Sequence, residues 1–217
     1  MKILLADDHP IFRQGLKSLI ESHFNNCEIT GVDNGLLAQE ELSKNQFDIA
    51  ILDIDMPEKS GIDVLKYIAE NEVPTLPIIL TMHNDELFFN EAFNNGAIGY
   101  LLKEDSSIEM VECIEKVLSG SQFVSEKIAP YLKNRKTFNS KINTIKSSIN
   151  SLSKVEYNTL KLVARNKSSK EISELLFVTV KSVENYRSRI CRKLDIKGGS
   201  NILYKWCVDN QDLLLFK

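Results

Sequence analysis

The sequence begins MKILLADDHP (residues 1–10), where the short apolar run Ile3–Ala6 ends in two aspartates. Four further runs are also continuous rather than alternating, as is typical of strands buried on both faces. They are Cys27–Val32, Phe47–Leu52, Pro77–Met82 and Ile98–Leu102. Because a helical pattern follows each run, the first part of the chain is predicted to be an α/β domain with a doubly wound five-stranded parallel sheet.

Polar side chains stand where the predicted strands end. Asp7 and Asp8 follow the first strand, Asp53 follows the third, Thr81 ends the fourth and Lys103 follows the fifth. These strand ends converge on one edge of such a sheet. Three carboxylates crowded there repel one another unless a cation lies among them, and their hard oxygen ligands suit Mg²⁺. With Lys103, a bound ion would favour transfer of a phosphoryl group to the Asp53 carboxylate.

Four segments make this half of the chain recognisable: LLADD (4–8), ILDIDMPEKSG (51–61), PIILTMH (77–83) and GAIGYLLK (96–103). They resemble the receiver domain of bacterial two-component response regulators, a flavodoxin-like fold with strand order 2-1-3-4-5. The resemblance implies that Asp53 is phosphorylated by a sensor histidine kinase.

The resemblance also assigns the other site residues. Asp7 and Asp8 would be the metal-site acids, with Mg²⁺ held by the side chains of Asp8 and Asp53 and by the backbone carbonyl of Asp55. Thr81 and Lys103 would bind the phosphoryl group, Tyr100 would be the aromatic switch residue, and Pro57 and Gly61 match the loop after the acceptor. In other receivers, the residues at the positions of Asp55 and His83 tune the rate of dephosphorylation.

A different class of protein shares part of this pattern. Asp53-Ile54-Asp55 fits the D-x-D nucleophile motif of haloacid-dehalogenase phosphatases, which also use a Thr or Ser, a Lys and an acidic pair. In that family the D-x-D motif lies on an early strand and the acidic pair comes last. Here Asp7-Asp8 precedes Asp53, so the order of motifs favours a receiver that is not an enzyme.

A third alternative is a regulator that binds DNA without phosphorylation and uses the receiver only to dimerise.

Charge divides the chain into an acidic front and a basic back. Residues 1–125 carry 8 Lys+Arg and 22 Asp+Glu, whereas residues 148–217 carry 13 and 7. A basic module is a candidate for binding phosphate backbones. Between the two halves, residues 126–147 are rich in Lys, Asn and Ser and lack a convincing apolar stripe, which indicates a linker that is partly helical.

Beyond the linker, helical patterns dominate and predict a small all-α domain. Ser153 and Glu156 have the spacing of a capping box, Ser168 or Ser169 can cap a second helix, and Thr179 precedes a third over about Val180 to Leu194. The third helix has a buried stripe and an open face rich in Arg and Asn, which suits the reading of base edges in a major groove.

Residues 150–197 resemble the LuxR-type helix-turn-helix of NarL/FixJ-family response regulators. The third helix would then be the recognition helix, although Glu184 and Tyr186 stand where many relatives carry Lys and His, so base preferences do not transfer. Residues expected to approach DNA bases are Lys181, Glu184, Asn185, Arg187, Ser188 and Arg189. Expected phosphate contacts are Lys170, Arg192 and Lys193.

The sequence therefore predicts a receiver domain at 1–122, a linker at 123–147 and a helix-turn-helix domain at 148–217. We expect a phosphorylation-controlled transcription regulator that binds double-stranded DNA as a homodimer, because one short recognition helix reads too few base pairs. The apolar runs are too short for a membrane helix, and the N-terminus does not match a secretory signal, so a cytoplasmic protein without a membrane partner is expected. The four scattered cysteines are expected to be reduced.

Overall fold

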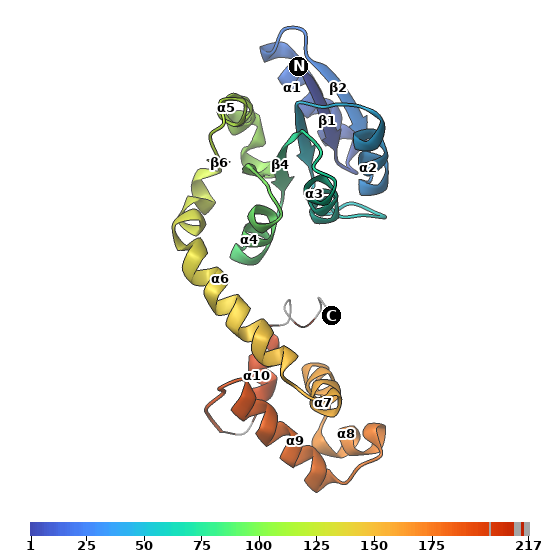
Figure 1. The fold of residues 1–217 in the computed structure, drawn as a ribbon, viewed down its shortest axis with the longest axis vertical. Coiled ribbons are helices and arrows are strands. Elements are labelled where there is room, and N and C mark those ends of the chain that lie inside the picture. The colour runs from blue at the N-terminus through green and yellow to red at the C-terminus, as the bar shows by residue number, and fades with distance from the viewer. Residues whose placement is uncertain (200, 211–213, 215–217) are drawn as a thin grey trace. The chain divides into compact units, whose positions relative to one another are not determined.

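The five apolar runs form parallel strands, and a short sixth strand extends the sheet. In the computed structural model, which describes residues 1–199, 201–210 and 214, the strand order is β2-β1-β3-β4-β5-β6 with every neighbouring pair parallel (Figure 1). The strands are β1 (Lys2–Ala6), β2 (Glu28–Val32), β3 (Ile49–Leu52), β4 (Leu76–Thr81), β5 (Gly99–Leu102) and β6 (Phe123–Val124).

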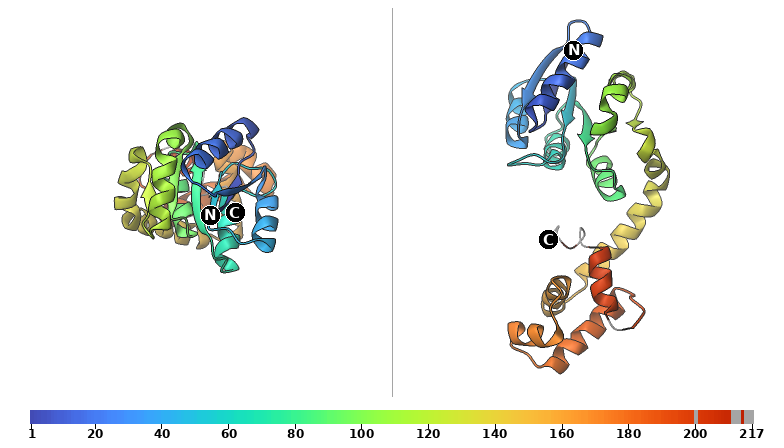
Figure 2. Two further views of the ribbon diagram at one scale, coloured as in Figure 1. Left: turned by 90° about the horizontal axis from the view of Figure 1, so that it is seen from above. Right: turned by 180° about the vertical axis from the view of Figure 1, so that it is seen from behind.

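Helices cover both faces of this sheet, since strand side chains point alternately to either side. Leu4, Leu52 and Ile79 pack in one cluster with α2, α3 and α4, whereas Leu5 and Ile51 pack in a second cluster with α1 and α5. The helices can be followed from two further sides in Figure 2. Their bounds are α1 (Pro10–His23), α2 (Gly35–Lys44), α3 (Gly61–Glu70), α4 (Glu86–Asn94) and α5 (Ser106–Leu118).

The sixth strand corrects our prediction of five and places part of the expected linker in the sheet. β6 pairs with β5 through only two residues, and buried Ser125 continues the ladder by donating its N–H to the Tyr100 carbonyl at 3.0 Å. The Ser125 hydroxyl also accepts from the Leu102 N–H at 3.2 Å and donates to the Glu109 carboxylate. A short 3₁₀ turn, η2 (Glu126–Ile128), follows, and its Ile128 is buried in the receiver core.

The rest of the expected linker is one continuous helix, α6 (Ala129–Asn150). The chain divides into two compact units, Met1–Arg135 and Lys136–Lys217, so the division falls inside α6. Among the described residues, no helix is long and apolar enough to cross a membrane.

The second unit contains the expected helices, and its caps follow the predicted chemistry. Ser153 with Glu156 and Ser168 with Glu171 form capping boxes, and Thr179 caps the third helix. A core that includes Leu160, Ile172, Val183, Ile190 and Leu203 joins the helices. The helices are α7 (Lys154–Ala164), α8 (Ser169–Leu176), α9 (Val180–Lys193) and α10 (Ile202–Asp209). Of the predicted domain 148–217, positions 200, 211–213 and 215–217 lie outside the described residues.

Gly61 fixes the path of the loop between β3 and α3. A Cβ atom added at Gly61 would lie 2.2 Å from the backbone oxygen of Asp53, far inside van der Waals contact. The Gly61 N–H also donates to the Ile54 carbonyl at 3.1 Å, which holds the two backbones together. Only glycine fits this close approach, next to a residue of the predicted site.

We expect Gly61→Ala to destabilise the receiver unit by about 1–3 kcal/mol, because the added methyl forces the loop away from Asp53. The measurement is urea unfolding of the full chain followed by circular dichroism. Gly15→Ala is the matched control, since a Cβ there meets nothing within 4 Å and alanine favours the α1 helix. Equal stability of the two variants would contradict the close approach.

Candidate functional site

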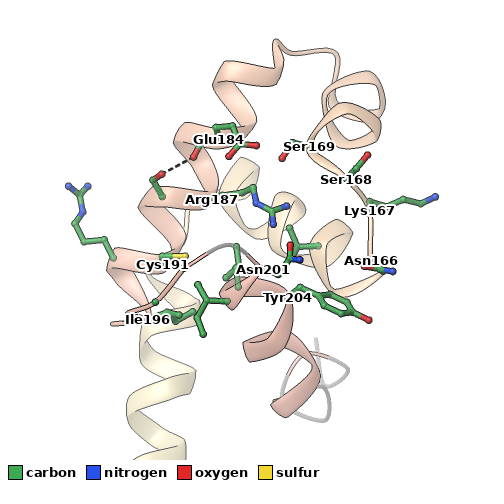
Figure 3. A pocket seen from close by; sticks show the side chains of 17 residues that line it. Asn166, Lys167, Ser168, Ser169, Glu184, Arg187, Cys191, Ile196, Asn201 and Tyr204 are labelled. Atoms are coloured by element: carbon green, nitrogen blue, oxygen red, sulfur yellow. Dashed lines mark hydrogen bonds between the residues drawn. The ribbon is translucent and has the colours of Figure 1, made fainter.

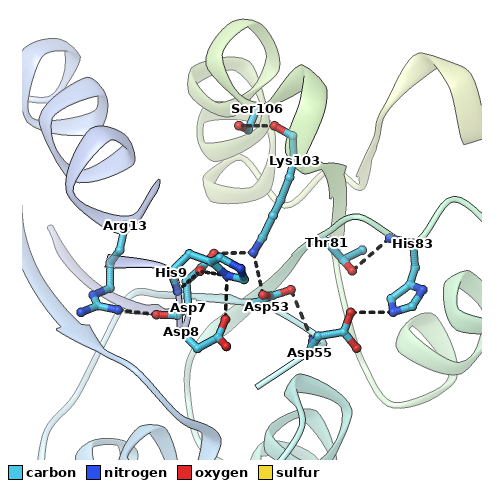
Figure 4. Close-up of polar contacts among 10 residues, drawn as sticks. All are labelled: Asp7, Asp8, His9, Arg13, Asp53, Asp55, Thr81, His83, Lys103 and Ser106. Carbon is cyan, nitrogen blue, oxygen red and sulfur yellow. Dashed lines mark hydrogen bonds and ion pairs between the residues drawn. The ribbon is translucent and has the colours of Figure 1, made fainter. Parts of the chain in front are cut away.

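Three acids meet at the carboxyl end of the sheet, as the sequence predicts (Figure 4). Asp7 follows β1 and is 1% exposed, and Asp53 follows β3 and is 2% exposed. One ligand atom each from Asp7, Asp8, His9 and Asp53 all lie within 4.8 Å of one another. Backbone hydrogen bonds from the Asp53 N–H to the Ala6 carbonyl (2.9 Å) and from the Asp7 N–H to the Val32 carbonyl (3.1 Å) hold this geometry.

Lys103 supplies the positive charge that faces these acids. Its Nζ lies 2.6 Å from Oδ2 of Asp53 and 2.8 Å from Oδ2 of Asp7, and its side chain is buried. The side chain of Lys103 also places its ammonium 5.0 Å from the centre of the Phe12 ring. Burial works to lower the pKa of Lys103, but hydrogen bonds and charges of the two carboxylates outweigh it and raise that pKa. The ammonium therefore stays protonated.

Burial has the largest effect on the pKa of the Asp53 carboxyl. Burial raises the pKa of Asp53, and the hydrogen bond and charge of Lys103 offset part of this effect. The negative charge of Asp7 adds to the rise. A second cation among the acids would favour the ionised carboxylate. This donor set, three clustered carboxylates of which that of Asp8 is partly exposed, fits a hard divalent cation such as Mg²⁺.

Asp55 turns its side chain away from the acid cluster. Its Oδ2 lies 2.8 Å from Nε2 of His83, while its backbone N–H donates to Oδ1 of Asp53 at 3.4 Å. The Asp55 carboxylate is not among the clustered ligand atoms. The expected metal contact of Asp55, through its backbone, does not require its side chain.

Thr81 and Tyr100 are joined through the loop that follows β4. The buried Thr81 hydroxyl accepts from the His83 N–H at 3.2 Å, and the Tyr100 hydroxyl donates to the His83 carbonyl at 3.0 Å. Tyr100 is fully buried, and burial raises its pKa. Its ring lies inside the domain and packs against Phe89, at 5.4 Å between ring centroids.

Two residues near the acids were not among the predicted site residues. Nδ1 of His9 lies 2.7 Å from Oδ1 of Asp8, and the His9 N–H donates to Oδ1 of Asp7 at 2.8 Å. The Arg13 guanidinium donates to the Asp7 backbone carbonyl. The position of His9 directly after the acidic pair is a signal in the sequence, whereas no sequence pattern marked Arg13, which reaches the Asp7 carbonyl from the first turn of α1.

On the second unit, α9 presents most of the predicted DNA-contacting side chains to solvent. Val183 and Ile190 are buried in the domain core. Seven of the predicted base-contact and phosphate-contact residues on this helix are exposed: Lys181, Glu184, Asn185, Ser188, Arg189, Arg192 and Lys193. Lys170, in the first turn of α8, is also exposed.

Arg187 differs from the other predicted DNA-contacting residues of α9, because it is half-buried and points toward the start of α8 (Figure 3). There it lines a hollow of about 830 Å³, together with Glu184, Ser188 and Arg192. The open face predicted for α9 is thus divided between a solvent-facing stripe and a stripe that borders this hollow. Polar residues that the sequence did not single out for function also line it: Asn166, Lys167 and Asn201.

Lys193 has partners inside the domain. Its Nζ lies 2.7 Å from Oε2 of the buried Glu156 and donates to the Ser151 carbonyl at 3.0 Å. Burial works to raise the pKa of Glu156, but hydrogen bonds from Lys193 and Ser153 outweigh it and lower that pKa. Lys193 therefore ties the end of α9 to the start of α7, a structural role that its sequence position alone does not reveal.

Both units match known families. The family model of the response regulator receiver domain matches residues 3–115, and that of the bacterial regulatory proteins of the luxR family matches residues 150–203. The oxygen regulatory protein NreC of Staphylococcus carnosus is 32% identical over 201 residues, with 91% of this chain and 93% of NreC covered. NreC of Staphylococcus aureus is 35% identical over 202 residues, with the same coverage.

Solved structures show the same fold. RcsB of Salmonella typhimurium superposes with a TM-score of 0.64 at 22% identity, covering 96% of this chain and 99% of RcsB. A LuxR-family two-component response regulator from Aurantimonas has a TM-score of 0.58 at 30% identity, covering 63% of this chain and 97% of that protein. Because receiver and LuxR-type domains follow one another here as in these relatives, this chain belongs to the NarL/FixJ response regulators, a family of DNA-binding transcription regulators rather than enzymes.

Proposed function

We propose that Asp53 accepts a phosphoryl group from a sensor histidine kinase, in a Mg²⁺-dependent reaction, and that this switches dimerisation and DNA binding. The observation that carries the proposal is the environment of Asp53. Its carboxylate is buried at the end of β3, 2.6 Å from the Lys103 ammonium and beside two further acids. A structural aspartate in the core would not need two more carboxylates around it.

The reaction that fits this site is the transfer of a phosphoryl group between two side chains. A carboxylate oxygen of Asp53 forms the new P–O bond as the P–N bond of a kinase phosphohistidine breaks, and the imidazole leaves with the electron pair. Lys103 then exchanges part of its contact with Asp53 for a phosphoryl oxygen, which holds the transferred charge. We propose, as the resemblance to receiver domains implies, that the side chains of Asp8 and Asp53 and the backbone carbonyl of Asp55 would hold Mg²⁺ with Asp7 beside them, and the clustering of the acids supports this. A bound ion would neutralise charge that develops on the phosphoryl oxygens.

Thr81 can pass the presence of the phosphoryl group to the loop that follows β4. A hydroxyl donates one proton and accepts through its lone pairs, so Thr81 can bond a phosphoryl oxygen and still accept from the His83 N–H. Any shift of Thr81 then moves His83, whose carbonyl is bonded to Tyr100. We propose that Tyr100 responds from its inward position by a change in this bond.

The second unit would bind double-stranded DNA with α9 in the major groove. Its exposed Lys181, Asn185 and Arg189 lie four residues apart on one stripe of the helix, and side chains of these types can contact base edges in a major groove. RcsB has been solved as a DNA complex and as two dimers bound to two parallel DNAs. We propose a homodimer for this chain as well, acting on DNA in the cytoplasm.

The two other functions are less favoured. The phosphatase alternative is excluded by the family, whose members are transcription factors. A regulator that never takes up phosphate would not need the clustered acids and the buried Lys103.

Asp53→Asn is expected to abolish uptake of acid-labile phosphate from acetyl phosphate in the presence of Mg²⁺, because an amide cannot act as the nucleophile. The measurement is the phosphorylated fraction by intact-mass spectrometry. Asp33→Asn, at an exposed acid of the same unit, is the control and should be phosphorylated like the native chain. Uptake that is unchanged in the Asp53 variant would refute the acceptor assignment.

Arg189→Ala and Arg187→Ala are each expected to weaken binding to operator fragments by about tenfold or more, the range of one lost arginine–base contact. Fragments recovered by genome-wide footprinting supply the DNA, and gel shifts give the affinities. Lys154→Ala removes an exposed charge from the start of α7 and should have a much smaller effect. If both arginine variants bind the operator fragments as tightly as the native chain does, the DNA-binding surface lies elsewhere on the protein.

Lys193→Ala is expected to destabilise the second unit by about 1–3 kcal/mol, discounted for the partial exposure of Lys193, because it leaves Glu156 buried without its cation. The stability from Glu156 is present above its ordinary pKa of 4.5 and is lost as the pH falls through its lowered value. In the variant the pKa of Glu156 is no longer lowered by Lys193, so thermal unfolding should show a smaller loss of stability upon acidification than in the native chain.

The salt dependence of DNA binding separates this structural role from a phosphate contact. Arg192→Ala should reduce the slope of log affinity against log salt by about one, whereas Lys193→Ala should leave the slope of the folded protein unchanged. If the Lys193 variant also shows a reduced slope, Lys193 contacts a DNA phosphate as the sequence predicts.

A further inference from the structure

Two tyrosine hydroxyls hold neighbouring carbonyls of the loop between β4 and α4. Tyr100, on β5, donates to the His83 carbonyl at 3.0 Å. Tyr131, in the first turn of α6, donates to the next carbonyl, that of Asn84, also at 3.0 Å. One loop is therefore bonded both to the switch position of the receiver and to the helix that leaves it.

The rings of the same two tyrosines meet at Phe89. This buried side chain of α4 lies 5.4 Å from the Tyr100 ring and 5.8 Å from the Tyr131 ring, measured between centroids. Close packing transmits a displacement of one ring to the other. The two tyrosines therefore share a backbone segment and an aromatic neighbour.

A second contact fixes α6 one turn further along. Arg135 donates to the side-chain oxygen of Asn94 at 2.7 Å, and its guanidinium lies 5.1 Å from the centre of the Phe93 ring. Tyr131 and Arg135 thus attach the first two turns of α6 to both ends of α4. Because α6 runs unbroken from Ala129 to Asn150, these turns belong to the same helix as the segment that precedes the DNA-binding helices.

We propose that Tyr131 is a positioning residue that couples the phosphorylation state of Asp53 to the docking of α6 on α4. The inference rests on the proposed function and adds to it a role for the Tyr131 hydroxyl. Thr81 accepts from the His83 N–H, so the chain of contacts runs from the phosphoryl site through His83 and Asn84 to Tyr131. The loop conformation that places the His83 carbonyl against Tyr100 also places the Asn84 carbonyl against Tyr131. Each hydrogen bond therefore stabilises the loop conformation that the other bond needs. Coupling of this kind is reciprocal.

The test is hydrogen exchange of the full chain, measured by mass spectrometry with and without acetyl phosphate and Mg²⁺. In the native protein, the phosphodonor should change exchange in residues 83–88 and 129–135 together. Tyr131→Phe removes only the hydroxyl. It should keep the change in 83–88, lose at least half of the change in 129–135, and without phosphodonor speed exchange in 83–88 about 2- to 10-fold, the range of one net hydrogen bond.

The control variant is Tyr67→Phe, on α3, whose hydroxyl makes no hydrogen bond to the residues that the structure describes. It should behave as the native chain does. A native response in 83–88 without one in 129–135, or a Tyr131 variant that keeps the full response in both segments, would overturn the coupling alone. No response in either segment, together with no phosphate on Asp53, would overturn the proposed function and the coupling with it.

Discussion

The mutual repulsion of buried carboxylates, balanced by one buried ammonium, is the constraint on which the receiver unit depends. Asp7 and Asp53 are almost without solvent, and Lys103 lies within 2.8 Å of both. Such a cluster is costly unless each charge is paired. Neighbouring features maintain the pairing: the close approach of Gly61 to the Asp53 backbone and the bond from Arg13 to the Asp7 carbonyl. A site held this tightly can register the arrival of a further charge.

The loop after β4 is where that charge can act on the rest of the unit. His83 alone has three kinds of contact: its N–H with Thr81, its carbonyl with Tyr100 and its ring with the Asp55 carboxylate and the face of Phe88. Asn84 adds a bond to α6. The loop is therefore bonded both to residues beside the acids and to α6. A displacement of the loop at one of these contacts must change the other.

In the DNA-binding unit, the same type of residue serves two purposes that only its partners distinguish. Arg189 and Lys193 are both basic residues of α9, four positions apart. Arg189 is exposed, whereas the Lys193 ammonium is committed to Glu156 and Ser151. The number of basic residues in this unit therefore overstates the charge that it offers to DNA, because the charge of Lys193 is used to join α9 to α7.

The sequence by itself determined the layered architecture, the acids at the strand ends and the helix caps, because these follow from local spacing and from the rule that parallel strands end at one edge. Tertiary structure alone decided the rest. β6 is only two residues long and depends on the bonds of Ser125, and α6 is a single helix although its composition is that of a linker. The inward Tyr100 and the pairing of Lys193 likewise arise from contacts between residues far apart in the chain. No local pattern encodes such contacts, because each is set by where a distant side chain comes to lie once the core has packed.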